Sequence, residues 1–254
     1  VTVGSKLVSH VGGGWDAAVI AIEPDGTVAW FKGAAGTGDD GVTDLAVGPD
    51  GDLLVAGTFV ADVDVAGAVM VDVEMGGVDS FLVKLAANNG ALRWSVQYGG
   101  VGPQLATALA TDGTGNVYVV GEYQWALTLD DGGLGETTAG DVNAFVDKRD
   151  SLGEEQWHLA LGDEQEQRVR SVAVTSEGAP LVVGDFGGTI AFDDASSITA
   201  EDGRDLFVSA LRSLHSRRSI AGVELPSNDP FIDEHRLIDD PFVADLWKAY
   251  KKCI

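Results

Sequence analysis

The 254-residue chain is poor in cysteine, long apolar runs and positive charge, and each shortage excludes a class of protein. Its single cysteine, Cys253, allows no intrachain disulfide and no cysteine-based metal site. No apolar run is long enough for a transmembrane helix, and no charged segment followed by an apolar one opens the chain as in a signal peptide. We therefore expect no membrane insertion.

The charge is strongly acidic and unevenly distributed. The chain has 16 Lys and Arg against 40 Asp and Glu, a net charge of −24. Residues 1–212 carry 10 of these basic and 33 of these acidic residues, so their net charge is −23, whereas residues 213–254 are close to neutral. An acidic body repels phosphate backbones and anionic lipids, so we expect no nucleic acid partner. Such a surface also keeps a β-rich protein soluble.

Glycine is abundant, with 34 residues, and 45% of the chain is apolar. Together with many Val, Leu and Thr residues, this indicates short strands joined by tight turns. Similar segments recur about every 63 residues, which is the mark of a repeat architecture. The positions that recur at this interval are Trp30, Trp94 and Trp157; Gly57, Gly121 and Gly184; and Gly51, Gly115 and Gly178.

One repeat can be divided into strands by its apolar pattern. Strands are predicted at 42–47 and 53–59, joined by a Pro-Asp-Gly turn, then at 79–85 and 91–98, joined by Asn-Gly. Between them, residues 62–75 alternate as an additional and more exposed hairpin. Four antiparallel strands in a unit are typical of a propeller blade, whose faces are covered by the neighbouring blades. We expect the recurring aromatics and the three tryptophans to be core residues, and the recurring glycines to serve close backbone approach or positive φ.

These segments resemble a known repeat. The strand Asp79–Leu85, the following Trp94 and the segment Gly115–Gly121 (GNVYVVG) are similar to bacterial β-propeller repeats of the SBBP type. The resemblance covers roughly residues 5–212. It implies a propeller fold and a secreted or cell-surface bacterial protein. It supplies no catalytic residues, because the family has no general catalytic motif.

The number of units does not make a whole propeller. We predict an all-β, β-propeller-like array of about 3.3 repeats over residues 1–212, incomplete or open. It consists of a partial unit at 1–38 and units at about 39–100, 101–162 and 163–212, followed by a Pro-containing linker and helical tail at 213–254. In the tail an Asp-Pro pair predicts a helix start, and one face of that helix would carry Phe242, Val243, Leu246, Trp247 and Tyr250. This face could cap an open blade edge or bind a groove on another protein. Alternatively, the tail did not arise with the repeats but through a fusion or a change of reading frame.

Few residues suggest chemistry. The chain has no metalloprotease, nucleophile-elbow, P-loop or Cys-x-x-Cys motif, and its four histidines occupy unrelated positions of the repeat. Carboxylates could present oxygens to Ca²⁺, which takes roughly six to eight of them. The calcium candidates are Asp39, Asp40, Asp62 and Asp64. No other cofactor is expected.

The leading hypothesis is a non-catalytic binding or scaffold protein that presents blade loops to a protein or glycan ligand. One alternative is a propeller enzyme of the hydrolase or lyase type, with carboxylates in a central channel and calcium among its ligands. Another is a subunit or fragment of a larger assembly that associates with itself or with a partner chain through open blade edges and the tail.

Overall fold

The computed structural model describes residues 2–3, 6–7, 14–72, 77–129, 132–134, 141–162, 165–191 and 197–211. These residues form strands and turns, with no helix among them, and all lie within one compact unit, Val1–Leu214. No helix in this part of the chain could cross a membrane. The predicted tail residues Phe242, Val243, Leu246, Trp247 and Tyr250 lie outside the described residues.

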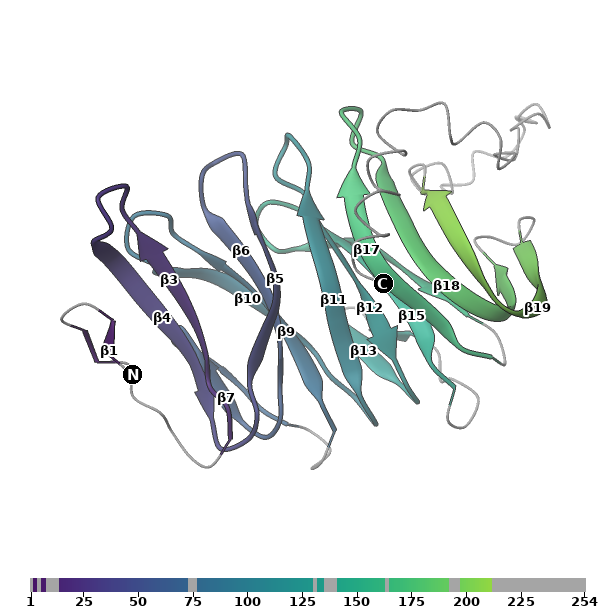
Figure 1. The fold of residues 1–254 in the computed structure, drawn as a ribbon, viewed down its shortest axis with the longest axis horizontal. Coiled ribbons are helices and arrows are strands. Elements are labelled where there is room, and N and C mark those ends of the chain that lie inside the picture. Colours follow the sequence, from purple (N-terminus) through teal and green to yellow (C-terminus); the bar gives the residue numbers. More distant parts are fainter. Residues whose placement is uncertain are drawn as a thin grey trace. The chain divides into compact units, whose positions relative to one another are not determined.

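Two complete four-stranded antiparallel sheets form the middle of the array (Figure 1). In both, the strand order follows the chain, as expected of a propeller blade. The second sheet contains β5 (Gly41–Val47), β6 (Leu53–Phe59), β9 (Asp79–Leu85) and β10 (Leu92–Tyr98). The third contains β11 (Gln104–Thr111), β12 (Val117–Tyr123), β15 (Asn143–Arg149) and β16 (Glu155–Leu161). The predicted all-β, blade-like architecture is confirmed.

The outer two sheets differ from this plan. The fourth sheet contains β17 (Gln167–Val174), β18 (Pro180–Ala191) and β19 (Ser197–Ala210), in that order. The first has the order β3-β4-β7-β8, with β3 (Ala17–Ile22), β4 (Val28–Gly36), β7 (Val63–Val65) and β8 (Ala68–Met70). Two small hairpins complete the described strands: β1 (Thr2–Val3) with β2 (Lys6–Leu7), and β13 (Leu127–Leu129) with β14 (Gly132–Leu134).

The hairpin predicted at 62–75 was wrongly interpreted as an exposed addition to its own unit. Instead β7 pairs with β4 of the preceding unit, Val65 opposite Ala34 and Val63 opposite Gly36. Val63 and Val65 are buried in the core between the first two sheets, whereas Val69 and Val71 are exposed. The alternating pattern was right, but the hairpin links two blades.

The recurring glycines have the two roles expected of them. A Cβ on Gly121 would overlap the carbonyl oxygen of Leu105 and the ring of Phe145, and Gly57 and Gly184 meet the same kind of obstacle. Gly115 has a φ of +89° in its turn, a conformation that side chains disfavour. The strand aromatics are buried as predicted: Phe59, Tyr123, Phe186, Phe81, Phe145 and Phe207.

Neighbouring sheets are joined by bonds that recur at the repeat interval. The indole of Trp30 donates to the carbonyl of Ala87 at 2.8 Å, and that of Trp94 donates to Ser151 at 3.1 Å. Each indole therefore reaches a turn of the next blade. The backbone amides of three equivalent residues donate to carbonyls in the preceding blade: Asp40 to Trp15, Gln104 to Val78, and Gln167 to Val142. Each apolar core lies between two adjacent sheets.

Candidate binding surface

The terminal strand β5 of the second sheet exposes apolar residues whose counterparts in the third and fourth sheets are buried. Leu45 on β5, Leu109 on β11 and Val172 on β17 occupy the same position of the repeat. Leu45 is 54% exposed, whereas Leu109 is 5% and Val172 is 7% exposed. Since the three residues are alike in chemistry, the difference arises from what lies in front of each strand.

The exposed surface continues along the strand. Val42 and Val47 of β5 are also exposed, and the counterparts of Val42 are fully buried: Ala106 and Val169. We call Val42, Leu45 and Val47 the β5 strip. Three accessible apolar residues on one strand are a feature of interaction surfaces more than of an ordinary monomer surface.

The cause is the composition of the first sheet. β11 packs against β5, β6 and β9 of the sheet before it, and β17 packs against β11, β12 and β15 in the same way. Within the described residues, the strand of the first sheet that packs against β5 is β3. Among the described strands, the first sheet has no counterparts of β5 and β6 that would lie in front of the β5 strip.

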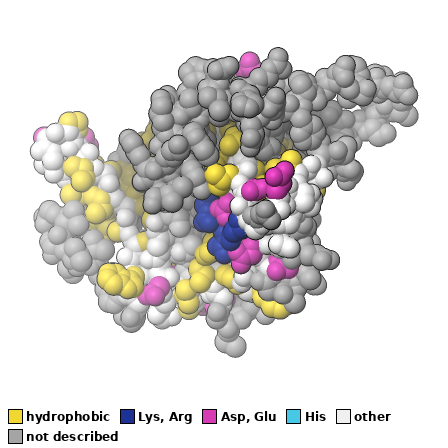
Figure 2. Space-filling view, turned by 45° about the vertical axis from the view of Figure 1, so that its right-hand side comes forward, with side chains coloured by type: hydrophobic (Ala, Val, Ile, Leu, Met, Phe, Trp, Pro, Cys, Tyr) yellow, Lys and Arg dark blue, Asp and Glu magenta, His cyan; other side chains and the backbone are white. Residues whose placement is uncertain are grey.

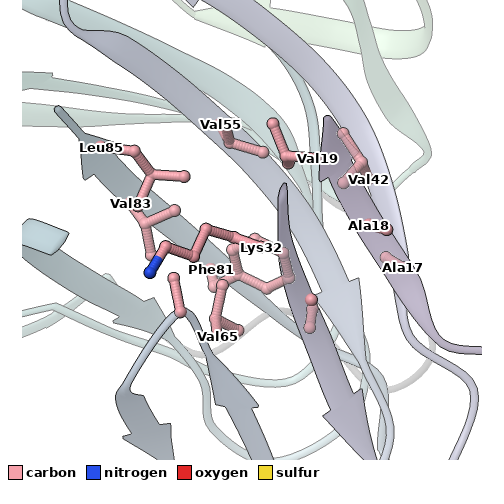
Figure 3. A pocket seen from close by; sticks show the side chains of 13 residues that line it. Ala17, Ala18, Val19, Lys32, Val42, Val55, Val65, Phe81, Val83 and Leu85 are labelled. Atoms are coloured by element: carbon pink, nitrogen blue, oxygen red, sulfur yellow. The ribbon is translucent and has the colours of Figure 1, made fainter. Parts of the chain in front are cut away.

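A pocket lies beside the β5 strip, between the first and second sheets (Figure 3). Ala17 and Val19 of β3 and Val42 line one side, and Phe81 and Val83 of β9 line the other (Figure 3). The lining is apolar apart from Lys32, whose side chain extends across the pocket. The pocket is thus an incompletely filled interface between blades.

Among the described strands, none pairs with the outer edge of β3. β9 and β15, its counterparts, each pair with a strand on both sides, whereas β3 pairs with β4 on one side and is the terminal strand of its sheet. Accordingly Ile20 and Ile22 are exposed, while the equivalent residues of β9, Val83 and Leu85, are buried. An edge strand with unpaired backbone groups is a template for pairing with another strand.

Three of the four calcium candidates make hydrogen bonds to the backbone. Asp39 accepts from the amide of Trp15 at 2.8 Å, Asp62 from that of Asp72 at 3.0 Å, and Asp64 from that of Gly67 at 2.6 Å. In the ranges that the structure describes, no three His, Cys, Asp or Glu side chains group as metal ligands would. Calcium binding stays a prediction.

The fourth candidate, Asp40, is a buried carboxyl group. Burial first, and the nearby Asp16 carboxylate second, raise its pKa to about 6, although the backbone amides of Gly36 and Val60 act in the opposite direction. Its counterpart Gln104 donates its side-chain amide to two backbone carbonyls. Asp40 thus places an acid where the next repeat uses an amide.

The sequence did not point to a cluster of arginines and carboxylates between the third and fourth sheets (Figure 2). Arg204 lies 2.6 Å from Asp185 and 2.7 Å from Glu166, and Arg168 lies 3.2 Å from the buried Glu122. Arg170 lies 2.8 Å from Asp185. Every arginine of this cluster is paired with a carboxylate, so the cluster joins two blades. The sequence contains one signal for this cluster, because Glu122 and Asp185 are acidic at the repeat position that Thr58 occupies in the second sheet.

A second network that sequence reasoning missed has its centre, Tyr98, Asp147 and Arg149, buried between the second and third sheets. The Tyr98 hydroxyl donates to Asp147 at 2.7 Å, and Arg149 donates to the same carboxylate at 2.7 Å. Burial raises the pKa of Asp147, and the charge of Arg149 acts against this. Glu155 lies 3.7 Å from Arg149 and 2.6 Å from His158. Because Asp147 is inaccessible, this network suits a structural role.

Comparisons with known proteins identify no family for this chain. No protein-family model matches the chain, and no curated protein matches its sequence. A solved structure described as "Structure of Dos1 propeller" is similar, with 13% sequence identity and a TM-score of 0.28 over 72% of this chain. The match covers 53% of that chain, about half its length. The strand order and the repeat positions identify the sheets as blades.

Proposed function

We propose that this protein is a non-catalytic scaffold that binds another protein through the β5 strip. The observation that carries the proposal is the exposure of Leu45 where Leu109 and Val172 are buried. A surface built like an internal interface favours a polypeptide ligand, because apolar burial is the main favourable term in protein association. An apolar strip with an adjoining unpaired strand edge offers little to a sugar.

A peptide library tests this function without assuming a ligand. Phage-displayed random peptides would be selected on the wild-type chain and then on a Leu45→Lys variant, with Leu152→Lys as the control. Leu152 is also an exposed leucine, in a turn of the third sheet, so the chemical change is the same. We expect enriched peptides that the control retains and Leu45→Lys loses. No enrichment, or equal retention by both variants, would contradict the proposal.

Glycan binding is the second candidate, and exposed tryptophans support it. Trp15 is 80% exposed and Trp125 is also exposed, and both lie in loops. Indole faces can stack on sugar rings because they combine an apolar surface with a polar edge. Loss of glycan-array binding in a Trp15→Ala and Trp125→Ala double variant, with Leu45→Lys unaffected, would favour this candidate.

The enzyme hypothesis and the origin of the chain remain proposals. Asp16 and Asp40 are a carboxylate pair with a raised pKa on Asp40, but the burial of Asp40 makes it a poor catalytic group. From the repeat resemblance we propose a bacterial SBBP-type protein that is secreted or displayed at the cell surface.

A further inference from the structure

We propose that the carboxylates of Asp16 and Asp40 and the backbone carbonyl of Asp62 form a calcium site where the first sheet meets the second. Ca²⁺ fits because it takes oxygen ligands from carboxylates, backbone carbonyls and water, in a flexible geometry. Of the candidates chosen from the sequence, the site uses Asp40 through its side chain and Asp62 through its backbone. The inference is independent of the β5 strip and of the proposed function.

The other repeats place a side-chain amide where Asp40 lies. Asp40, Gln104 and Gln167 are equivalent, since each donates its backbone amide to the preceding sheet. The side-chain amide of Gln104 donates to the carbonyl of Ala126 at 2.7 Å. That of Gln167 donates to the carbonyl of Gly187 at 3.2 Å. An ionised carboxylate has no hydrogen to donate, so Asp40 cannot make the bond that both glutamines make.

At the first interface, two oxygen atoms line the space that a donor and an acceptor share in the next repeat. A Cβ added at Gly36 would lie 2.5 Å from the carbonyl oxygen of Asp62 and 3.1 Å from Oδ2 of Asp40. At the counterpart, Gly100, it would lie 2.6 Å from the carbonyl oxygen of Ala126 and 3.5 Å from the glutamine Nε2 that donates to that oxygen. Oδ2 thus replaces a donor nitrogen beside an equivalent carbonyl. A cation is a ligand that two such oxygens can share.

Asp40 is buried without a hydrogen bond to its carboxylate. The residue is 5% exposed, and neither carboxylate oxygen has a hydrogen-bond partner among the described residues, although the backbone amides of Gly36 and Val60 are nearby. Two further carboxylates, those of Asp16 and Asp39, act on its charge. A buried carboxylate is costly unless it is paired or coordinates a metal. A bound cation would supply the compensating charge.

Asp16 brings the second carboxylate to this place. Asp40 donates its backbone amide to the carbonyl of Trp15, the residue before Asp16, at 2.6 Å. The corresponding pairs at the other two interfaces each contain at least one amide: Asp79 with Gln104, and Asn143 with Gln167. The first interface therefore differs from both by combining two acids. Two carboxylates, a backbone carbonyl and water can together supply roughly the six to eight oxygens that Ca²⁺ takes.

Calorimetric titration of the full chain with CaCl₂, after EDTA treatment and removal of the EDTA, tests the site. The main variant is Asp40→Gln, which introduces the residue that the other repeats use at this position. Asp16→Asn is a second test variant, because asparagine occupies the equivalent position before the strand β15. The control is Asp79→Asn, which removes a buried carboxylate at the repeat position of Asp16 but leaves the first interface unchanged.

We expect one saturable site with a dissociation constant on the order of 10⁻⁴–10⁻³ M, as in extracellular calcium modules. Asp40→Gln should abolish this binding and Asp16→Asn should weaken it about tenfold or more, since affinity depends on the number of charged ligands. Asp79→Asn should retain it. Calcium should also raise the unfolding temperature of the wild type and of Asp79→Asn, but not that of Asp40→Gln. Mg²⁺ should bind more weakly, because it demands octahedral geometry and loses its water reluctantly.

Three results would overturn the inference. No saturable binding to the wild-type chain would mean that a proton alone neutralises the pair. Equal binding by the wild type and Asp40→Gln would mean that calcium only adsorbs to the acidic surface. A loss of binding in Asp79→Asn as large as in Asp40→Gln would indicate a general effect of charge or folding. The peptide library tests the proposed function separately, so the two failures are distinguishable.

Discussion

The buried pair Asp147 and Arg149 allows a test in which the repeat supplies its own replacement residues. The equivalent residues of β9 are Val83 and Leu85, both buried in an apolar core. The pair is inaccessible on both partners, with the guanidinium 2.7 Å from the carboxylate. A buried ion pair often contributes little compared with apolar residues of similar volume, although breaking it by removing one partner is harmful.

The expected change in the free energy of unfolding depends on which buried charge loses its partner. Asp147→Val leaves the Arg149 guanidinium buried with Glu155 at 3.7 Å, and Arg149→Leu leaves a buried carboxylate with the Tyr98 hydroxyl. Each single change should lower the free energy of unfolding by about 3–5 kcal/mol. The double variant removes both charges but leaves the tyrosine hydroxyl unpaired, which costs about 1–3 kcal/mol. Adding Tyr98→Phe removes that group too, so the triple variant should lie within about 1 kcal/mol of wild type.

The assay is urea unfolding of the wild type, the singles, the double and the triple, followed by tryptophan fluorescence. The two single changes should be strongly non-additive, with a coupling free energy of at least about 3 kcal/mol. If the double variant were as unstable as the sum of the singles, or if the triple variant were less stable than either single, the ion pair would be stabilising in itself. The expectation that apolar residues, as at Val83 and Leu85 of β9, can replace the ion pair would then be refuted.

Three further predictions concern single positions. The pKa of Asp40 is raised to about 6, so the folded state holds a proton between pH 4 and 6 that the unfolded state has lost, and stability falls as pH rises through this range. Asp40→Asn should flatten this dependence and raise the free energy of unfolding at pH 7.5 by up to about 3 kcal/mol in urea titrations; an unchanged pH profile would contradict it. Trp94→Phe removes the indole bond to the next blade and should lower stability by about 1–2 kcal/mol, against less than about 0.5 for the exposed Trp15→Phe, both measured by thermal unfolding. Gly121→Ala should cost about 3 kcal/mol in urea because its Cβ meets a carbonyl and a ring, whereas Gly113→Ala, with open space around its Cβ, should be nearly neutral; equal effects would contradict the overlap.

Much of the fold was predictable because its signals are local and recur. The strand Asp79–Leu85 has the predicted bounds, and the strands around Gly57 and Gly121 follow the predicted hairpin pattern. The partner of the hairpin β7–β8 was not predictable in this way. Its alternation indicates a hairpin, but the sequence contains no local signal that its pairing strand, β4, belongs to the preceding unit.

The candidate surface was not predictable for a related reason. Leu45, Leu109 and Val172 give the same sequence signal, and they differ only in whether a hairpin stands before them. The predicted calcium acids were chosen for spacing along the chain. In the structure, the carboxylates of Asp39 and Asp64 accept hydrogen bonds from the backbone amides of Trp15 and Gly67. A pattern of oxygens in sequence does not distinguish a metal ligand from a turn acceptor.

The bonds between blades explain why the exposed β5 strip has the chemistry of an internal interface. A backward amide bond joins each pair of adjacent sheets, a forward tryptophan bond joins the first two pairs, and a paired hairpin joins the first pair. In such arrays stability comes from interfaces between adjacent units, so a unit's outer surface has the chemistry of an interface whether or not it is covered. The β5 strip is therefore no separate apolar patch. Its counterparts, Leu109 and Val172, are covered by the apolar residues of a hairpin within the chain, so Leu45 has the chemistry of a residue that is buried between two sheets.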